Sequence, residues 1–148
     1  MDTSLFKKII VAFDESPEAG RALDSAMALA HSLGSALHTV TVVKPLPPYM
    51  AYAEATDPAV SQVIEQDHIE FYEGLRTAAQ ARAAEAGLQA VTHLVDGSEI
   101  ESIVSLLREQ RADLLVLGLH NKSLYIARLW STVYELAQQA PCSVLGVH

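Results

Sequence analysis

The sequence predicts an α/β fold: a single domain built on a doubly wound, five-stranded parallel sheet with helices on both faces. Short apolar runs alternate along the chain with longer stretches in which apolar residues recur at helical spacing. Half of the 148 residues are hydrophobic, which is enough to build one sizeable core. No repeat, linker or low-complexity segment divides the chain, so residues 1–148 are expected to form one domain.

The first strand is predicted at residues 9–13, where β-branched side chains are frequent. Ser16 suits the N-cap of the helix that follows, Pro17 suits its first position, and Gly34 suits its end. Apolar residues form one broad face of this helix: Ala19, Ala22, Leu23, Ala26, Leu29, Ala30 and Leu33. The second strand is predicted at residues 37–43.

Residues 44–58 contain four prolines and are predicted to be a loop. A helix is predicted over residues 59–86, because Gly87 follows and apolar residues share a face before it. The predicted inner face consists of Val60, Ile64, Phe71, Leu75 and Ala79. Residues 88–95 alternate enough in polarity for a third strand.

After Gly97, Ser98 and Glu101 have the spacing of a capping box that starts a helix. Its predicted inner face consists of Ile100, Ile103, Val104 and Leu107. Residues 114–117 form a continuous apolar run that ends at Gly118 and is typical of a strand buried on both faces. A polar loop follows, and a last helix, with Val133, Leu136, Ala137 and Ala140 on one face, ends at Pro141. Residues 143–147 are the predicted fifth strand.

The arrangement of strand, glycine, polar loop and helix around Gly118 is one that presents backbone N–H groups to an anion. Asn121 adopts left-handed backbone conformations more readily than most residues. Thr132 has two explanations: a hydroxyl that contacts the anion, or the first residue of a capping box, since it has the required spacing to Glu135. Asp14 also has two explanations: a ligand-binding carboxylate, or a residue that stabilises the entry to a helix.

Both halves of the chain resemble the universal stress protein family. Val11, Asp14, Ser16 and Pro17 have the spacing of the family's N-terminal signature, and residues 140–144 resemble its C-terminal Ala-Pro-Cys-x-Val ending. The resemblance covers essentially the whole chain. It implies a Rossmann-like or flavodoxin-like sheet with strand order 3-2-1-4-5 and a switch point between the first and fourth strands.

In the family, a segment with three glycines holds the phosphates of ATP. Gly118, Asn121 and Ser131 have the spacing of those glycines, and Thr132 stands at the hydroxyl position after them. The resemblance therefore implies ATP, with Mg, or AMP as a cofactor of a weakened site at the switch point. The implied nucleotide-binding residues are Asp14, Val42, Gly118, His120, Asn121, Ser131, Thr132 and Val133.

Two other functions are compatible with the same residues. A member that binds no nucleotide, similar to universal stress protein A, would act through protein partners. A small α/β enzyme would use His120 or Asp14 near the switch point. No catalytic residue or metal site is predicted, because neither nucleophile motifs nor metal-ligand spacings occur. At most, slow ATP hydrolysis is expected.

The net charge is −8 and the pI is near 5.1, which argues against nonspecific binding to nucleic acid or to anionic membranes. No apolar run approaches the roughly 20 residues of a membrane helix, and the N-terminus lacks the features of a signal peptide. A cytoplasmic protein is expected. Residues 143–147 carry no charge, and the family commonly dimerises through this strand, so a homodimer is expected with Val144, Leu145 and Val147 at the interface.

Overall fold

The computed structural model describes residues 5–119 and 126–148, and within these ranges all side chains except those of residues 126–131. Five parallel strands form one sheet in the order β3-β2-β1-β4-β5. The strands are β1 (Lys8–Ala12), β2 (Ala36–Val43), β3 (Ala90–Asp96), β4 (Leu114–Gly118) and β5 (Ser143–Val147). The predicted fold class and strand order are confirmed.

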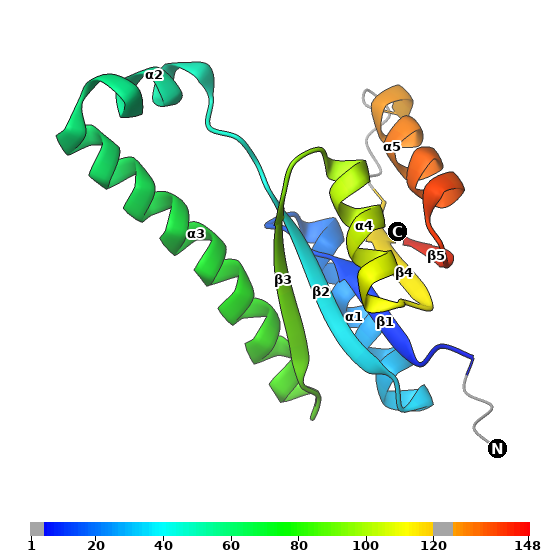
Figure 1. Ribbon diagram of the computed structural model, residues 1–148. Helices are drawn as coiled ribbons and strands as arrows, with labels where there is room; N and C mark the ends of the chain where they lie inside the picture. The colour runs from blue at the N-terminus through cyan, green and yellow to red at the C-terminus, as the bar shows by residue number, and fades with distance from the viewer. Residues whose placement is uncertain (1–4, 120–125) are drawn as a thin grey trace.

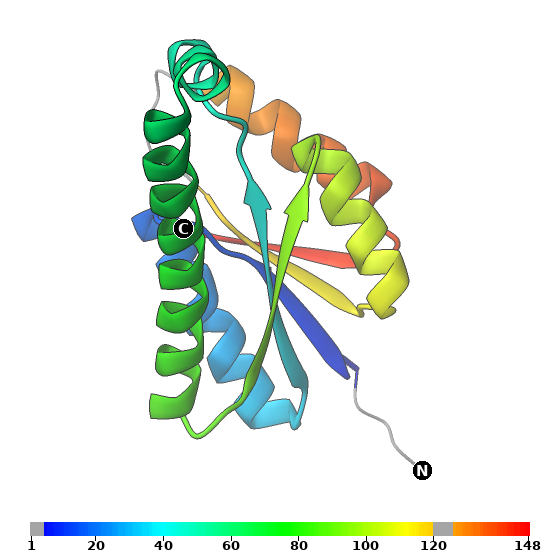
Figure 2. The same ribbon diagram turned by 60° about the vertical axis from the view of Figure 1, so that its left-hand side comes forward.

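The described residues form five helices between these strands: α1 (Pro17–Leu33), α2 (Pro48–Thr56), α3 (Pro58–Glu85), α4 (Glu99–Gln110) and α5 (Ile126–Gln139). Helices α1 and α3 pack on one face of the sheet, and α4 and α5 pack on the other (Figures 1 and 2). Each face has its own cluster of buried residues, so the sheet separates two apolar layers. No described helix, within residues 5–119 and 126–148, combines the length and apolarity needed to cross a membrane.

The predicted starts of α1 and α4 are confirmed. The Ser16 side chain accepts a hydrogen bond from the backbone N–H of Ala19 at 3.2 Å, and the Ser98 side chain accepts one from Glu101 at 3.4 Å. Gly34 ends α1 with φ of 69°, in the left-handed region that favours glycine. The predicted inner face of α1 holds except at its end, where Leu33 is 39% exposed.

The prediction of a loop over residues 44–58 is wrong, because most of this segment is α2. Pro48 and Pro58 each stand in the first turn of a helix, where the missing proline N–H costs nothing. The predicted inner faces of α3 and α5 are also partly wrong, since Val60 and Ala137 are exposed. Phe71 is 47% exposed, whereas its neighbour Tyr72 is buried and its hydroxyl accepts a hydrogen bond from the Lys44 backbone N–H at 2.8 Å.

Candidate functional site

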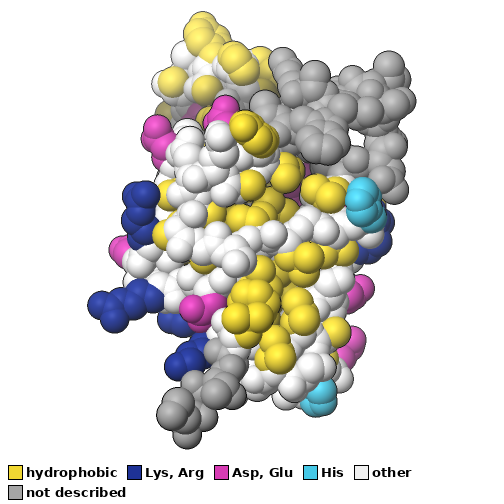
Figure 3. Space-filling model, turned by 90° about the vertical axis from the view of Figure 1, so that its right-hand side faces the viewer, with side chains coloured by type: hydrophobic (Ala, Val, Ile, Leu, Met, Phe, Trp, Pro, Cys, Tyr) yellow, Lys and Arg dark blue, Asp and Glu magenta, His cyan; other side chains and the backbone are white. Residues whose placement is uncertain are grey.

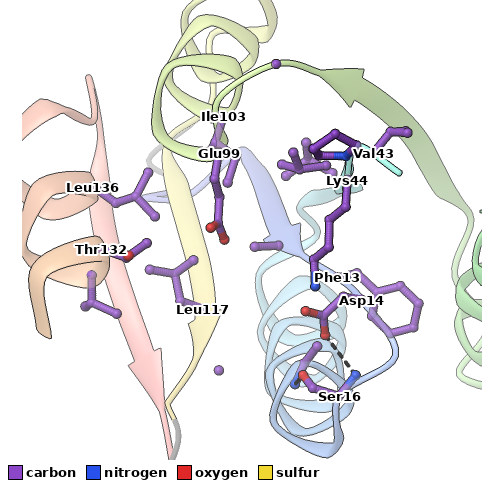
Figure 4. Close-up of a pocket in the computed structure, with 18 residues that line it drawn as sticks. Phe13, Asp14, Ser16, Val43, Lys44, Glu99, Ile103, Leu117, Thr132 and Leu136 are labelled. Atoms are coloured by element: carbon purple, nitrogen blue, oxygen red, sulfur yellow. Dashed lines mark hydrogen bonds between the residues drawn. The ribbon is translucent and has the colours of Figure 1, made fainter. Parts of the chain in front are cut away.

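A pocket of about 290 Å³ lies at the carboxyl edge of the sheet, beside the adjacent strands β1 and β4. This is the switch point, because the strands that follow β1 and β4 in the chain are added on opposite sides of this pair. Residues from both halves of the chain line it (Figure 4). The first half contributes the segments that follow β1 and β2, and the second contributes the end of β4, the start of α4 and one face of α5. The structure thus brings five of the eight candidate residues to one pocket: Asp14, Val42, Gly118, Thr132 and Val133.

The loop after β1 is fixed by short-range hydrogen bonds. A carboxylate oxygen of Asp14 accepts the backbone N–H of Ser16 at 2.8 Å, and Ser16 in turn caps α1. The Thr41 hydroxyl donates to the carbonyl of Phe13 at 2.7 Å, which ties this loop to β2. Asp14 therefore shapes the entry to α1, which is one of its two explanations, and it also lines the pocket. Its role as a ligand-binding carboxylate stays a prediction.

The end of β2 forms an apolar side of the pocket, and the Lys44 ammonium group lies next to it. Val40 and Val42 point to this side of the sheet, and Lys44 follows them. Figure 4 shows the Lys44 side chain extending toward Asp14. Lys44 is the one lysine or arginine among the described residues that line the pocket. The hydrogen bond from its backbone to Tyr72 holds this segment against α3.

Gly118 lies at the pocket, but its lack of a side chain has a packing reason. A Cβ at this position would collide with the backbone carbonyl of Glu18, in the first turn of α1. Its φ is not positive, in contrast to Gly34, Gly87 and Gly97. Gly118 is therefore required for the close approach of α1 to β4 whether or not an anion binds there.

Helix α5 begins at Ile126, before the position that the sequence suggested. Thr132 and the backbone of Ser131 lie inside the helix, so the proposed capping box of Thr132 and Glu135 is wrong. Thr132 and Val133 still face the pocket, from the second turn. His120 and Asn121 lie outside the described residues, and the side chain of Ser131 is not described.

Sequence reasoning missed Glu99, Lys44 and Ser16 as pocket residues. Figure 4 shows the Glu99 carboxylate reaching from the start of α4 into the space between β4 and β1. Each of the three follows the carboxyl end of a strand within a few residues. That position was the available signal, because ligands of open α/β sheets bind beyond those ends.

The pocket carries more negative than positive charge. Asp14 and Glu99 contribute carboxylates, and Lys44 contributes the one ammonium group among the described lining residues. The starts of α1 and α4 adjoin the pocket, and each helix start is equivalent to roughly half a positive charge. The rest of the described lining is mostly apolar, so the site suits a flat, largely uncharged group beside a small anionic one.

Cys142, the one cysteine of the sequence, directly precedes β5. Burial raises the pKa of the Cys142 thiol, and the nearby Asp113 carboxylate raises it further, so the thiol stays protonated at neutral pH. Within the part of the chain that the structure describes, no three His, Cys, Asp or Glu side chains are grouped so that they could hold a metal ion.

Two histidines form a polar pair on the opposite end of the α4 side of the sheet. Nδ1 of His38 on β2 lies 2.9 Å from Nε2 of His93 on β3, and the two rings are stacked with centroids 5.1 Å apart. Burial lowers the pKa of both rings. The other ring and the Lys8 ammonium lower the pKa of His38 further. Lys8 also lowers the pKa of His93, against a smaller opposing effect of Glu109. Both rings are therefore neutral at pH 7. Neither histidine lines the pocket.

Comparison with known proteins gives one consistent family. A family model described as the universal stress protein family matches residues 5–148. A protein of Thermus aquaticus, named as the universal stress protein in the QAH/OAS sulfhydrylase 3′ region, is 29% identical over 97% of this chain and 99% of its own. A solved structure from the universal stress protein family of Burkholderia pseudomallei is also 29% identical, with a TM-score of 0.69 over 97% of both chains.

Two solved structures that are less similar in sequence hold adenine nucleotides. A universal stress protein in complex with cAMP is 24% identical, with a TM-score of 0.74 over 98% of this chain and 99% of its own. A universal stress protein from Archaeoglobus fulgidus in complex with dAMP is 18% identical, with a TM-score of 0.69 over 97% and 99%. At these identities the likeness establishes a shared fold.

Proposed function

This chain belongs to the universal stress protein family, and on that basis we propose that it is a regulatory binding module of the stress response whose pocket takes an adenine mononucleotide. The observation that carries the proposal is the pocket itself, which residues from both halves of the chain build at the switch point of the sheet. The cAMP and dAMP bound by two proteins of the same fold have in common an adenine and one phosphate group.

Electrostatics favours a monophosphate over a triphosphate. The two helix starts together offer about one positive charge and Lys44 offers another, whereas Asp14 and Glu99 oppose them with two full negative charges. A ligand with several phosphates would have to approach these carboxylates without a surplus of cations from the described lining. The apolar lining around Val40 and Val42 suits the purine ring.

Titration calorimetry with adenosine, AMP and ATP, without added Mg²⁺, tests this proposal. AMP should bind at least about tenfold more tightly than ATP, because each additional phosphate charge meets the same carboxylates. The Glu99→Gln variant should reduce the ratio of AMP affinity to ATP affinity, since it removes a negative charge and keeps the shape of the side chain. Glu101→Gln is the matched control, because Glu101 lies in the same helix turn and does not line this pocket.

Two results would contradict the proposal. The first is no detectable heat with any of the three ligands at millimolar concentration. The second is tighter binding of ATP than of AMP that Glu99→Gln leaves unchanged.

A homodimer through β5 is the second part of the proposal. Strand β5 is an edge of the sheet, and Leu145 on it is 37% exposed, with Val144 and Val147 half-buried beside it. Figure 3 views the side of the molecule that carries this edge and shows hydrophobic side chains gathered in its middle and lower parts. An apolar edge strand without charges can pair with its symmetry mate.

Light scattering coupled to size exclusion tests the dimer. The wild type should have twice the 16.0 kDa mass of the chain, and Leu145→Lys should shift the protein toward the monomer. Tyr134→Lys is the control, because Tyr134 is a large exposed side chain on a helix surface. A wild type that remains monomeric at high concentration would refute this assembly.

A further inference from the structure

Helix α2 and the first half of α3 project beyond the sheet. Figure 2 shows α2 past the carboxyl ends of β2 and β3, and Figure 1 shows α2 and the first half of α3 to one side of the other helices. We call residues 48–71 the arm. Helix α2 buries none of its residues, and in the arm part of α3 only Ile64 is buried. The arm is therefore a surface that the rest of the described chain does not cover.

The arm concentrates exposed apolar side chains. Of the eleven large hydrophobic side chains that are exposed in the described part of the chain, six belong to the arm. These six, with their exposed fractions, are Tyr49 (75%), Tyr52 (72%), Val63 (60%), Ile69 (49%), Phe71 (47%) and Val60 (36%). Single exposed apolar residues are ordinary, but such a concentration in 24 residues is typical of an interaction surface.

The charge of the arm has one sign. It contains five carboxylates, at Glu54, Asp57, Glu65, Asp67 and Glu70, and no lysine or arginine. The arm thus carries −5 of the net −8, while the other 124 residues carry −3. Contact between the arms of two copies would bring ten carboxylates together, so like charge disfavours a second copy as the occupant. The same sign excludes nucleic acid and anionic lipid.

The arm is presented on a fixed base. Further along α3, Ala79 and Ala83 are fully buried, and the Arg82 guanidinium donates to the Gly20 carbonyl at 3.1 Å and pairs with the Asp24 carboxylate. Closer to the end of the arm, the Arg76 side chain donates a hydrogen bond to the Thr92 hydroxyl on β3 at 3.0 Å. Since these contacts fix the orientation of the helix, little conformational entropy would be lost when a partner binds the arm.

We propose that the arm docks a basic, amphipathic segment of another protein. Its apolar side chains would pack on Val63 and Ile69, which line a shallow hollow of α3 together with Glu65 and Asp67. Its lysines and arginines would pair with those carboxylates and with Glu70. Tyr49 and Tyr52 on α2 add aromatic surface that suits guanidinium groups. This surface is separate from the nucleotide pocket, and the inference does not depend on nucleotide binding.

Fluorescence anisotropy with three labelled peptides tests the inference on the full chain. The first is an amphipathic helical peptide of leucine and lysine, the second is oligolysine of equal charge, and the third is the leucine and glutamate counterpart of the first. The leucine–lysine peptide should bind, oligolysine should bind about tenfold more weakly, and the acidic peptide should not bind.

Three combined variants locate the binding. Val63→Ser with Ile69→Ser removes apolar surface, and Glu65→Gln with Asp67→Asn and Glu70→Gln removes charge; each should weaken binding about tenfold. The matched control, Glu85→Gln with Glu101→Gln and Glu109→Gln, removes the same charge from exposed positions outside the arm and should change binding less than about twofold. All of these positions are exposed, so circular dichroism should show unchanged folding.

Any of three outcomes overturns the inference. If the control weakens binding as much as the arm variants do, the peptide senses only net charge. If the serine variant binds like the wild type, the apolar surface plays no part. If the arm variants change the mass of the assembly, the arm is an interface between copies of this chain.

Discussion

The two faces of the sheet are packed with different kinds of side chain. On the face that α1 and α3 cover, six of the eight buried helix residues of the cluster are alanines. On the face that α4 and α5 cover, the buried helix residues are Ile103, Val104, Leu106, Leu107 and Leu136. On the first, closely packed face, the stability of the packing therefore depends on how closely backbones approach. On the second, bulky face, it depends on how well large side chains fill the space.

The pocket and the tight contact between α1 and β4 lie on different faces of the sheet. The α4 and α5 side holds most of the pocket lining and the pair of His38 and His93. The α1 and α3 side brings α1 so close to β4 that Gly118 cannot carry a side chain. The closely packed face should therefore fail when residues are enlarged, and the other face when they are truncated.

The largest expected effect is that of Leu107→Ala on the bulky face. Leu107 is fully buried, and its truncation should lower the free energy of unfolding by about 3 kcal/mol, because it leaves a cavity that the neighbours fill only in part. The same substitution at Leu33, on the edge of the other face and 39% exposed, should cost less than about 1 kcal/mol. Urea denaturation measures both, and equal losses would show that the two positions do not differ in packing.

Enlargement of the closely packed face should come next. Gly118→Ala places a Cβ against the carbonyl of Glu18 and should cost about 2 kcal/mol or more. Gly74→Ala is the matched control in α3, where a Cβ would meet nothing within 4 Å. It should stabilise the protein by about 0.5 kcal/mol, since alanine favours a helix over glycine. Opposite signs in urea denaturation are the expected result, and a neutral Gly118→Ala would contradict the close approach.

A smaller effect is expected for the polar contact that joins the two helices of the closely packed face. Arg82→Met removes the hydrogen bond to Gly20 and the pair with Asp24 and keeps most of the side-chain bulk. The expected loss is about 0.5–1 kcal/mol, because the contact is partly exposed. Arg108→Met, at an exposed position of α4, should change stability by less than about 0.5 kcal/mol. A larger loss at Arg108 would reverse the comparison.

The smallest effect should be a pH dependence that belongs to the bulky face. The pKa values of His38 and His93 lie below the ordinary 6.5, so below that pH the unfolded chain binds protons that the folded chain does not. The free energy of unfolding therefore includes a contribution from the two neutral rings. It is fully present above pH 6.5 and is lost as the pH falls from 6.5 toward the lowered pKa values. The urea midpoint should fall between about pH 7.5 and 5.5, and His93→Gln should reduce that fall. His31→Gln, at an exposed position of α1, should leave the fall unchanged.

Local signals in the sequence predicted much of the fold. The caps of α1 and α4 were predictable because a serine and the N–H group that it accepts are three residues apart. The strands were predictable because apolar runs bounded by turn residues have few alternatives. The strand order came from the family resemblance, and the structure has the same order.

Features that depend on distant partners, and local patterns that are compatible with two structures, could not be predicted. Tyr72 rather than Phe71 faces inward, because only a tyrosine hydroxyl can accept the Lys44 N–H. The packing role of Gly118 depends on Glu18, which lies far away in the sequence. The start of α5 was misplaced because Thr132 and Glu135 have a capping spacing that also occurs inside helices. The four prolines of residues 44–58 favour a loop, although proline also starts helices.

The position of β1 has a consequence for the order in which the molecule folds. Ile9 pairs with Leu114 in register, and α1 rests on Gly118, so the central strand gains its second neighbour only from a segment about a hundred residues later. Contacts between such distant segments close slowly, because the intervening chain must first be brought together. During synthesis, β1, α1 and β2 can therefore associate early, but they expose an open apolar edge until β4 has left the ribosome.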